Sequence, residues 1–229
     1  MHSSGVRICP DRVSTPNQKE AAAISQAEQA YQVLEHCLVT LELNPGSIVS
    51  EGQLIQRVGL GRTPVREAML RLAHQELIQV MPRKGLMIVP IRRADMQNIL
   101  EARKPLEQLI VRRAALQARD EQRSSLSAIA RTLSISHESF ETFLRLDREL
   151  DALLDVCAGN SFASAAVAPL RTHCRRFWAF YRHRLQLSDA ISAHSTMIRL
   201  IARRDYNGAQ KASDAVINVL ERLAAGMEQ

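Results

Sequence analysis

The stretch GLGRTPVREAM, Gly59 to Met69, is typical of the start of an amphipathic helix. Pro64 suits the first helical turn, because its φ angle is fixed near the helical value and its missing N–H is not needed there. Thr63 is predicted to cap the free N–H groups of that turn. Apolar residues then recur at helical spacing, namely Val65, Ala68, Met69 and Leu72. A helix is therefore expected from here to about residue 75.

Arg62 and Arg66 stand at the N-terminal end of this helix, away from its apolar face. A helix N-terminus already carries a partial positive charge. Two arginines there either bind an anion or are ordinary solvated surface charges. Between residues 57 and 92, seven Arg and Lys residues stand against two glutamates, so this segment carries five of the chain's six net positive charges. A run of charge alone is more typical of a solvated face, but here it coincides with a specific pattern of predicted elements.

The segments around this helix predict a winged helix-turn-helix. A first amphipathic helix is expected over about 20–42, a second over 51–58 with Ser50 as its cap, and a hairpin over 77–91. The hairpin has a basic tip with a glycine, formed by Arg83, Lys84 and Gly85. Three helices followed by a hairpin place the third helix in the DNA major groove. The polar residues 1–19 are expected to form a flexible N-terminal arm, which leaves 20–91 as the DNA-binding domain.

The remainder of the chain, 93–229, reads as helical throughout. Helices are expected near 94–118, 120–135, 138–158, 160–184, 188–204 and 207–226. Pro105 and Pro169 lie inside these segments and should kink their helices. The fold class is therefore mostly α, with an N-terminal winged helix-turn-helix and a C-terminal all-helical bundle of six or seven helices.

Composition excludes several classes of protein. No run of apolar residues is long enough to span a membrane, and the N-terminus lacks the apolar segment of a secretion signal. The four cysteines are scattered without the spacing of a zinc site. Buried, reduced thiols in a cytoplasmic protein are expected.

Residues 43–91 resemble the DNA-binding domain of GntR-type bacterial transcription regulators, through R-T-P-V-R-E-A and the following R-K-G. The family usually has Ser or Thr where this chain has Gly61. The C-terminal part resembles the helical FCD effector domain of the FadR branch, and a count of six helices would place it in the VanR-type subgroup. The residues that carry this second resemblance are Glu101, Arg103, Asp147, Gly159, Asn160 and His194. The resemblance implies a homodimer that binds a palindromic DNA operator and responds to a small metabolite, mostly a carboxylic acid in this family.

Within the helix-turn-helix, different residues are expected to contact different parts of the DNA. Arg62 and Arg66 are expected to read guanine edges, because a guanidinium can donate two hydrogen bonds to one guanine. Thr63 suits a phosphate, and Arg83, Lys84 and Gly85 suit the DNA backbone or minor groove. Gly85 can alternatively serve only the turn. Arg57 is expected to contact phosphate or to remain a surface charge.

The resemblance also implies a metal site of one Asp and three His inside the bundle. The corresponding residues here are Asp147, Asp151, His194 and Val216, so two match, one is a different possible ligand and one cannot coordinate. If both carboxylates face inward, they repel each other unless a cation or a proton intervenes. Asp151 can alternatively face solvent near Arg145 or Arg148. Two carboxylates and one imidazole would suit Mg²⁺ or Mn²⁺ as a divalent metal cofactor.

Arg103 is the candidate to bind the carboxylate of an effector, since the resembled family often uses this position for the carboxylate of its ligand. A salt bridge to Glu101 or Glu107 is the alternative. The other candidate effector contacts are Asp147, Asn160, His173 and His194. The aromatic stretch 172–184 is more typical of core or dimer surface than of a ligand pocket.

Two other functions remain open from the residues alone. One is a metal-dependent enzyme that uses Asp147, Asp151 and His194. Against it, no catalytic triad, phosphate loop or HExxH motif is recognisable, and the DNA-binding module would have no purpose. The other is an architectural DNA-binding dimer that senses nothing. The expectation is a regulator and not an enzyme.

Overall fold

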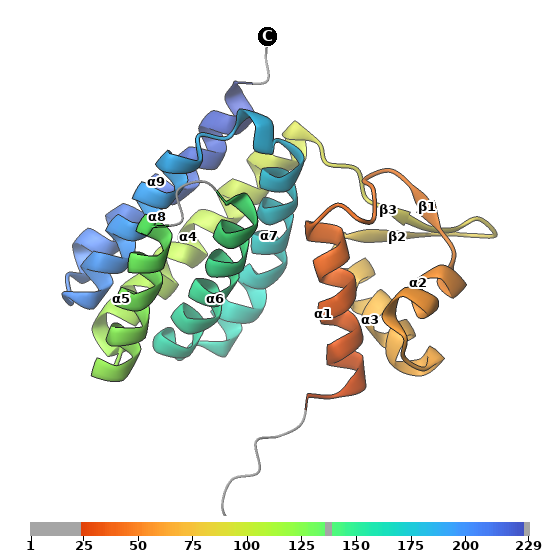
Figure 1. Cartoon of the computed structure of the whole chain (residues 1–229), viewed down its shortest axis with the longest axis horizontal. Coiled ribbons are helices and arrows are strands. Elements are labelled where there is room, and N and C mark those ends of the chain that lie inside the picture. Colours follow the sequence, from red (N-terminus) through yellow and green to blue (C-terminus); the bar gives the residue numbers. More distant parts are fainter. Residues whose placement is uncertain (1–23, 136–138, 227–229) are drawn as a thin grey trace, which may run out of the picture.

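The structure is a computed structural model that describes residues 24–135 and 139–226. In this part of the chain a small winged domain lies beside a bundle of long helices (Figure 1). Each has its own hydrophobic core. The winged domain is centred on residues such as Leu34, Val65 and Leu77. The expected N-terminal arm, 1–19, lies outside the described residues.

The winged domain has three helices and a three-stranded sheet. The helices are α1 (Gln26–Val39), α2 (Glu51–Val58) and α3 (Arg62–His74). The strands are β1 (Ile48–Val49), β2 (Ile78–Met81) and β3 (Gly85–Ile88), in the antiparallel order β1-β3-β2. The hairpin of β2 and β3 is the expected wing. The short strand β1 was not expected, because the sequence shows its two residues only as the end of a turn.

Local sequence explains how α2 and α3 begin and pack. Ser50 caps α2 and forms a capping box with Gln53, as expected. The four apolar residues predicted to share one face of α3 are all buried. The prediction for the α3 cap was wrong, because the helix begins at Arg62 and its N-cap is Gly61, which makes no side-chain hydrogen bond. Thr63 therefore lies inside the first turn and does not cap it.

Helix α1 is shorter than predicted at its C-terminal end. It ends at Val39, and Leu41 takes a left-handed backbone angle of φ 64° that ends the helical path. At its start, Ser25 accepts a hydrogen bond from the Glu28 backbone. Residues 20–23 of the predicted helix lie outside the described residues.

The described part of the C-terminal bundle has six α-helices. They are α4 (Arg93–Gln117), α5 (Asp120–Ile135), α6 (Phe140–Ala158), α7 (Ser161–Phe180), α8 (Leu187–Ala202) and α9 (Tyr206–Ala225). The predicted helix 160–184 ends earlier, and a short 3-10 turn, η1 (Arg182–Arg184), follows it. Pro105 and Pro169 lie inside α4 and α7, which continue through them. No helix in the described ranges is long and apolar enough to cross a membrane.

Several aromatic and cysteine residues of the two domains are buried. Phe177 and Trp178 of the aromatic stretch are fully buried in the core, whereas Phe180 is 42% exposed. Cys37, Cys157 and Cys174, the cysteines among the described residues, are buried free thiols. Packing, and not metal or disulfide chemistry, explains their positions.

Helix α7 joins the bundle to the winged domain. It lies at the edge of the bundle next to α1 (Figure 1), and the two helices pack together. The Thr172 hydroxyl donates a 2.6 Å hydrogen bond to Glu35 on α1. Glu35 also lies 3.5 Å from Arg148 of α6. Helix α1 of the winged domain therefore contacts both α7 and α6 of the bundle.

Candidate functional site

The N-terminal end of α3 presents the predicted DNA readers to solvent. Arg62, Thr63 and Arg66 are all exposed. Arg66 donates to the Glu51 carboxylate at the start of α2, with its Nε at 2.7 Å and its Nη2 at 3.3 Å. This pair is open to water, so its loss costs little when a stronger acceptor approaches. Two exposed guanidinium groups therefore stand at this end of α3, that of Arg66 in an ion pair with Glu51.

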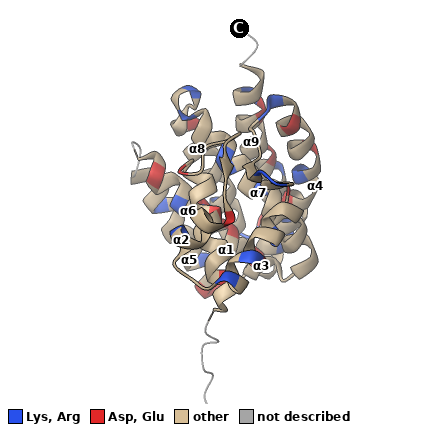
Figure 2. Cartoon of the chain, turned by 90° about the vertical axis from the view of Figure 1, so that its right-hand side faces the viewer, with Lys and Arg blue, Asp and Glu red and all other residues tan. Residues whose placement is uncertain are grey.

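The wing tip carries Arg83 and Lys84, both exposed. Gly85 beside them has φ 114°, and a Cβ there would lie 2.6 Å from the Val49 carbonyl oxygen. Only glycine fits this close approach of two strands, which favours the structural alternative for Gly85. Figure 2 views the molecule from the side of the wing, with basic positions in blue. Basic residues of α3 and of the wing occur on this side of the molecule.

Arg57 and Arg71 are held within the domain. Arg57 donates to Glu42 at 2.7 Å, and Arg71 donates to Glu28 at 2.6 Å while its guanidinium lies 3.6 Å from the centre of the Tyr31 ring. These contacts fix both side chains beside α1 and the loop after it. A phosphate contact by Arg57 remains a prediction, whereas Arg62 has the freer approach to DNA.

Inside the bundle, Asp147 and Asp151 of α6 both face inward, with exposed fractions of 3% and 9%. Arg175 of α7 bridges them: its Nε donates to Asp147 at 2.8 Å, and its Nη2 donates to Asp151. The alternative that Asp151 faces solvent was wrong. The two arginines proposed to neighbour it pair elsewhere, Arg145 with Glu149 and Arg148 with Glu35.

A second arginine extends the same network toward α4. Arg171 forms a two-pronged pair with Glu107, with both N–O distances at 2.8 Å, and also lies 3.2 Å from Asp151 and 3.1 Å from Asp155. Glu107 in turn accepts from Arg103 at 2.9 Å. The charge cluster defined here contains Arg103, Glu107, Asp147, Asp151, Asp155, Arg171, Arg175 and His194.

Charge compensation sets the ionisation of this charge cluster. Burial raises the pKa of Glu107, but Arg171 and Arg103 outweigh it and hold that pKa at about 2. Burial also opposes ionisation of Asp147, and Arg175 and His194 lower its pKa below the usual range. Asp151 differs, because burial and the neighbouring Asp147 raise its pKa to about 6 despite two arginines.

A divalent metal ion does not fit among these residues. Arg175 already occupies the position between the two carboxylates where a cation would sit. The His194 Nε2 lies 3.2 Å from Asp147, and its Nδ1 lies 2.6 Å from the Ala190 carbonyl oxygen, so both ring nitrogens face acceptors. Across the ranges that the structure describes, no group of three or more His, Cys, Asp or Glu side chains is arranged to hold a metal.

The space beside the charge cluster is small. The cavity has a volume of about 10 Å³ and is lined by residues that include Arg103, Asp151, His194 and Val216. A volume of this size holds one water molecule at most. An organic ligand can therefore enter only if the surrounding helices separate.

Two of the predicted effector residues lie elsewhere. Asn160 caps α7, where its side chain accepts a 3.1 Å hydrogen bond from the Ala163 backbone. His173 points to the domain junction, with its Nε2 2.9 Å from the Gln75 carbonyl oxygen. The structure thus gathers Arg103, Asp147 and His194 at the charge cluster and separates Asn160 and His173 from it.

Comparison with known proteins agrees with both halves of this fold. Residues 26–88 match the family described as bacterial regulatory proteins, gntR family, and residues 98–219, over half of the chain, match the FCD domain. The chain belongs to the GntR family of transcription regulators and carries an FCD domain. Its exposed arginines on α3 therefore lie on a helix-turn-helix of DNA-binding type.

This GntR protein also resembles individual relatives and a solved structure. The HTH-type transcriptional repressor RspR of Escherichia coli (strain K12) is 26% identical over 188 residues, which cover 81% of this chain and 82% of the relative. An uncharacterised regulator of Streptomyces ambofaciens is 43% identical over 75 residues, 31% of this chain and 32% of the relative. The structure of E. coli McbR/YncC superposes with a TM-score of 0.80 at 17% identity, over 90% of this chain and 100% of the other. That structure shares the fold.

Sequence reasoning on this GntR protein missed the arginines of α7. Arg171 and Arg175 are four residues apart, as are Asp147 and Asp151 on α6. Each pair lies on one helix face, and two such pairs of opposite charge on buried helices are the signal that could have been used. Glu107 was considered only as a partner for Arg103, and its pairing with Arg171 came from the structure.

Proposed function

We propose that this GntR-family protein acts in the cytoplasm as a homodimer on a two-fold symmetric operator, and that a small carboxylic acid in the FCD domain alters its DNA affinity. The family and the exposed readers Arg62 and Arg66 support the DNA part. A single reading helix recognises only a short half-site, so two copies are needed for a long recognition sequence. Six helices in the described bundle support a place in the VanR-type subgroup of the FadR branch.

The proposed response to an effector rests on one observation: helix α7 contacts the interior of the bundle on one side and the winged domain on the other. On one side, Arg171 and Arg175 form ion pairs with α4 and α6 inside the bundle. On the other side, Thr172 and His173 contact the winged domain. A ligand that rearranges the ion pairs of the charge cluster would displace α7, and α7 would transmit that displacement to the DNA-binding domain.

Arg103 is the proposed partner of the effector carboxylate. In the structure its guanidinium is paired with Glu107, which also has Arg171 as a partner. An incoming carboxylate would take the place of Glu107 on Arg103, leaving Glu107 neutralised by Arg171. This exchange keeps every buried guanidinium paired, and the contact with Arg103 offsets part of the cost of desolvating the incoming carboxylate.

A carboxylic-acid panel tests this proposal. A stabilising compound is identified by thermal shift on the wild-type protein and is then titrated against operator binding at fixed salt. Arg103→Met is expected to lose at least tenfold in affinity for that compound. The control Lys104→Met is expected to keep it, because the Lys104 side chain is 40% exposed and lies outside the charge cluster. Unchanged affinity in Arg103→Met would reject the assignment of Arg103.

A DNA-binding dimer without an effector is the second candidate. The observation in its favour is the small cavity of about 10 Å³ beside a network whose arginines are already paired. If no compound of the panel binds and operator affinity is constant, this candidate is preferred. An enzyme is disfavoured, because the carboxylates of the charge cluster are engaged by arginines and leave no free general base.

A further inference from the structure

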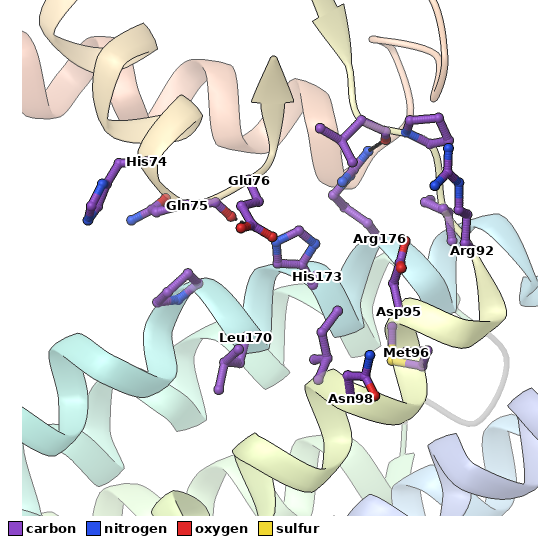
Figure 3. A pocket seen from close by; sticks show the side chains of 15 residues that line it. His74, Gln75, Glu76, Arg92, Asp95, Met96, Asn98, Leu170, His173 and Arg176 are labelled. Carbon is purple, nitrogen blue, oxygen red and sulfur yellow. Dashed lines mark hydrogen bonds between the residues drawn. The ribbon is translucent and has the colours of Figure 1, made fainter.

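A second cavity lies at the junction of the two domains. Its volume is about 330 Å³, within the range of small-molecule sites. It is formed by the turn after α3, the linker before α4, and the first turns of α4 facing α7 (Figure 3). The lining residues that matter here are Glu76, Val89, Arg92, Asp95, His173 and Arg176.

Arg176 of α7 is a buried cation without an acidic partner at this cavity. Only 1% of its surface is exposed. Its Nη2 donates to the Val89 carbonyl oxygen at 2.6 Å, while its Nε has no hydrogen-bond acceptor within reach among the described residues. Burial alone lowers the pKa of Arg176 to about 10. Burying a charge without a counter-ion costs free energy, and binding of an anion would offset that cost.

The other two arginines of α7 are also buried, but unlike Arg176 they are paired with carboxylates. Arg171 and Arg175 are as deeply buried as Arg176, and each contacts at least two carboxylates. Glu76 and Asp95 line the junction cavity, but both are exposed and neither forms an ion pair with Arg176 in the described structure. The side chain is therefore left for a partner from outside the chain.

We propose that the junction cavity binds a small organic anion, whose carboxylate or phosphate group pairs with the Arg176 guanidinium. The Nη2 contact to Val89 remains in place in this arrangement. His173, held by the Gln75 carbonyl oxygen, and Arg92 lie on the cavity wall around the anion. The volume of about 330 Å³ is sufficient for a metabolite of a few carbon atoms.

An anion in this cavity would bind both domains at once. The lining comes from the turn after α3 in the winged domain, from the linker 89–92 and from two helices of the bundle. Filling it would hold the recognition helix in a fixed orientation relative to the bundle. This site is separate from the charge cluster, on the opposite side of α7, and the two can be tested independently.

The test uses the full-length protein and three probes, citrate, succinate and inorganic phosphate. Isothermal calorimetry and thermal shift are expected to show saturable binding of at least one probe, with an increase in Tm. Arg176→Met is expected to reduce its affinity at least tenfold and to leave the Tm without probe unchanged or higher, because an uncompensated buried charge has been removed. Arg182→Met, which removes an exposed arginine, is the control and keeps the binding.

Asn98→Trp provides a second variant if Arg176→Met does not fold. Asn98 is an exposed residue on the cavity wall, and a tryptophan there fills the space while leaving Arg176 in place. Loss of binding in this variant supports the site. The proposal is overturned if no probe binds the wild type at millimolar concentration, if binding survives in Arg176→Met or Asn98→Trp, or if a folded Arg176→Met loses several degrees of Tm without probe.

Discussion

Arg175 and Arg176 are neighbours in the chain, yet their guanidinium groups lie on opposite sides of α7 in opposite electrostatic settings. Arg175 faces the bundle interior and pairs with Asp147 and Asp151. Arg176 faces the domain junction, where its Nη2 donates to the Val89 carbonyl oxygen. One helix therefore contacts both the candidate sensing region and the DNA-binding domain.

Removal of Arg175 should be strongly destabilising. Arg175→Met leaves Asp147 without its guanidinium partner and weakens the compensation of Asp151 in a buried setting. Loss of one partner from a buried ion pair costs roughly 3–5 kcal/mol. Urea unfolding at pH 7 measures this, with Arg182→Met as an exposed control that changes stability by less than about 1 kcal/mol. Similar stabilities for the two variants would contradict the described ion pairs.

The ion pairs of Glu107 should make the stability of the protein sensitive to acid. Its pKa is lowered from 4.5 to about 2 in the folded protein, so its stabilising effect is complete above pH 4.5 and is lost as the pH falls toward 2. Glu107→Gln should therefore be less stable than the wild type by about 3 kcal/mol at pH 7. The difference should shrink between pH 4.5 and pH 2. Denaturant unfolding across this range measures it, and a difference that stays constant with pH would count against the assignment.

Arg175 also predicts how the protein behaves with metal ions. The wild type is expected to bind no Mn²⁺ or Mg²⁺ at the charge cluster, because the guanidinium already compensates the carboxylates. Val216→His alone should not create a site, whereas Val216→His with Arg175→Ala should bind Mn²⁺ in calorimetric titrations. Metal found in the purified wild-type protein and bound through Asp147 and His194 would show that this account is wrong.

Arg66 and Arg71 should differ in their effect on DNA recognition. Arg66 is in the first turn of α3 and its pair with Glu51 is exposed, so it can turn to a base edge. Arg71 lies further along the helix, paired with Glu28 over the Tyr31 ring. Arg66→Ala is expected to lower operator preference over random DNA at least tenfold, and Arg71→Ala less than threefold. Titrations at one salt concentration compare them, since DNA affinity is salt-dependent.

The sequence predicted the elements whose signals are local. The apolar spacing of Val65, Ala68, Met69 and Leu72 and the cap at Ser50 each depend on residues within two helical turns, and all were confirmed. The error at Thr63 was one of register, because a helix can begin two residues earlier when Gly61 precedes it. Strand β1 depends on pairing with β3, a contact between segments far apart in the chain.

The charge cluster was not predicted, because its partners come from different helices. Near Asp151 the sequence shows Arg145 and Arg148, whereas the actual partners, Arg171 and Arg175, lie on α7. Which face of α7 meets α6 is decided by packing, and the stretch THCRRFW does not reveal that adjacent arginines have different surroundings. The same limit applies to His173, whose helix was predicted and whose direction was not.

Sequence-specific operator binding is the central claim, and selection of bound DNA from a random library tests it most directly. Wild-type protein is expected to enrich a sequence with two-fold symmetry, to bind it as a dimer by light scattering, and to prefer it over random DNA by at least a thousandfold. The double variant Arg62→Ala with Arg66→Ala should enrich nothing. A wild-type protein that enriches no sequence, or that binds the selected DNA as a monomer, would contradict the account.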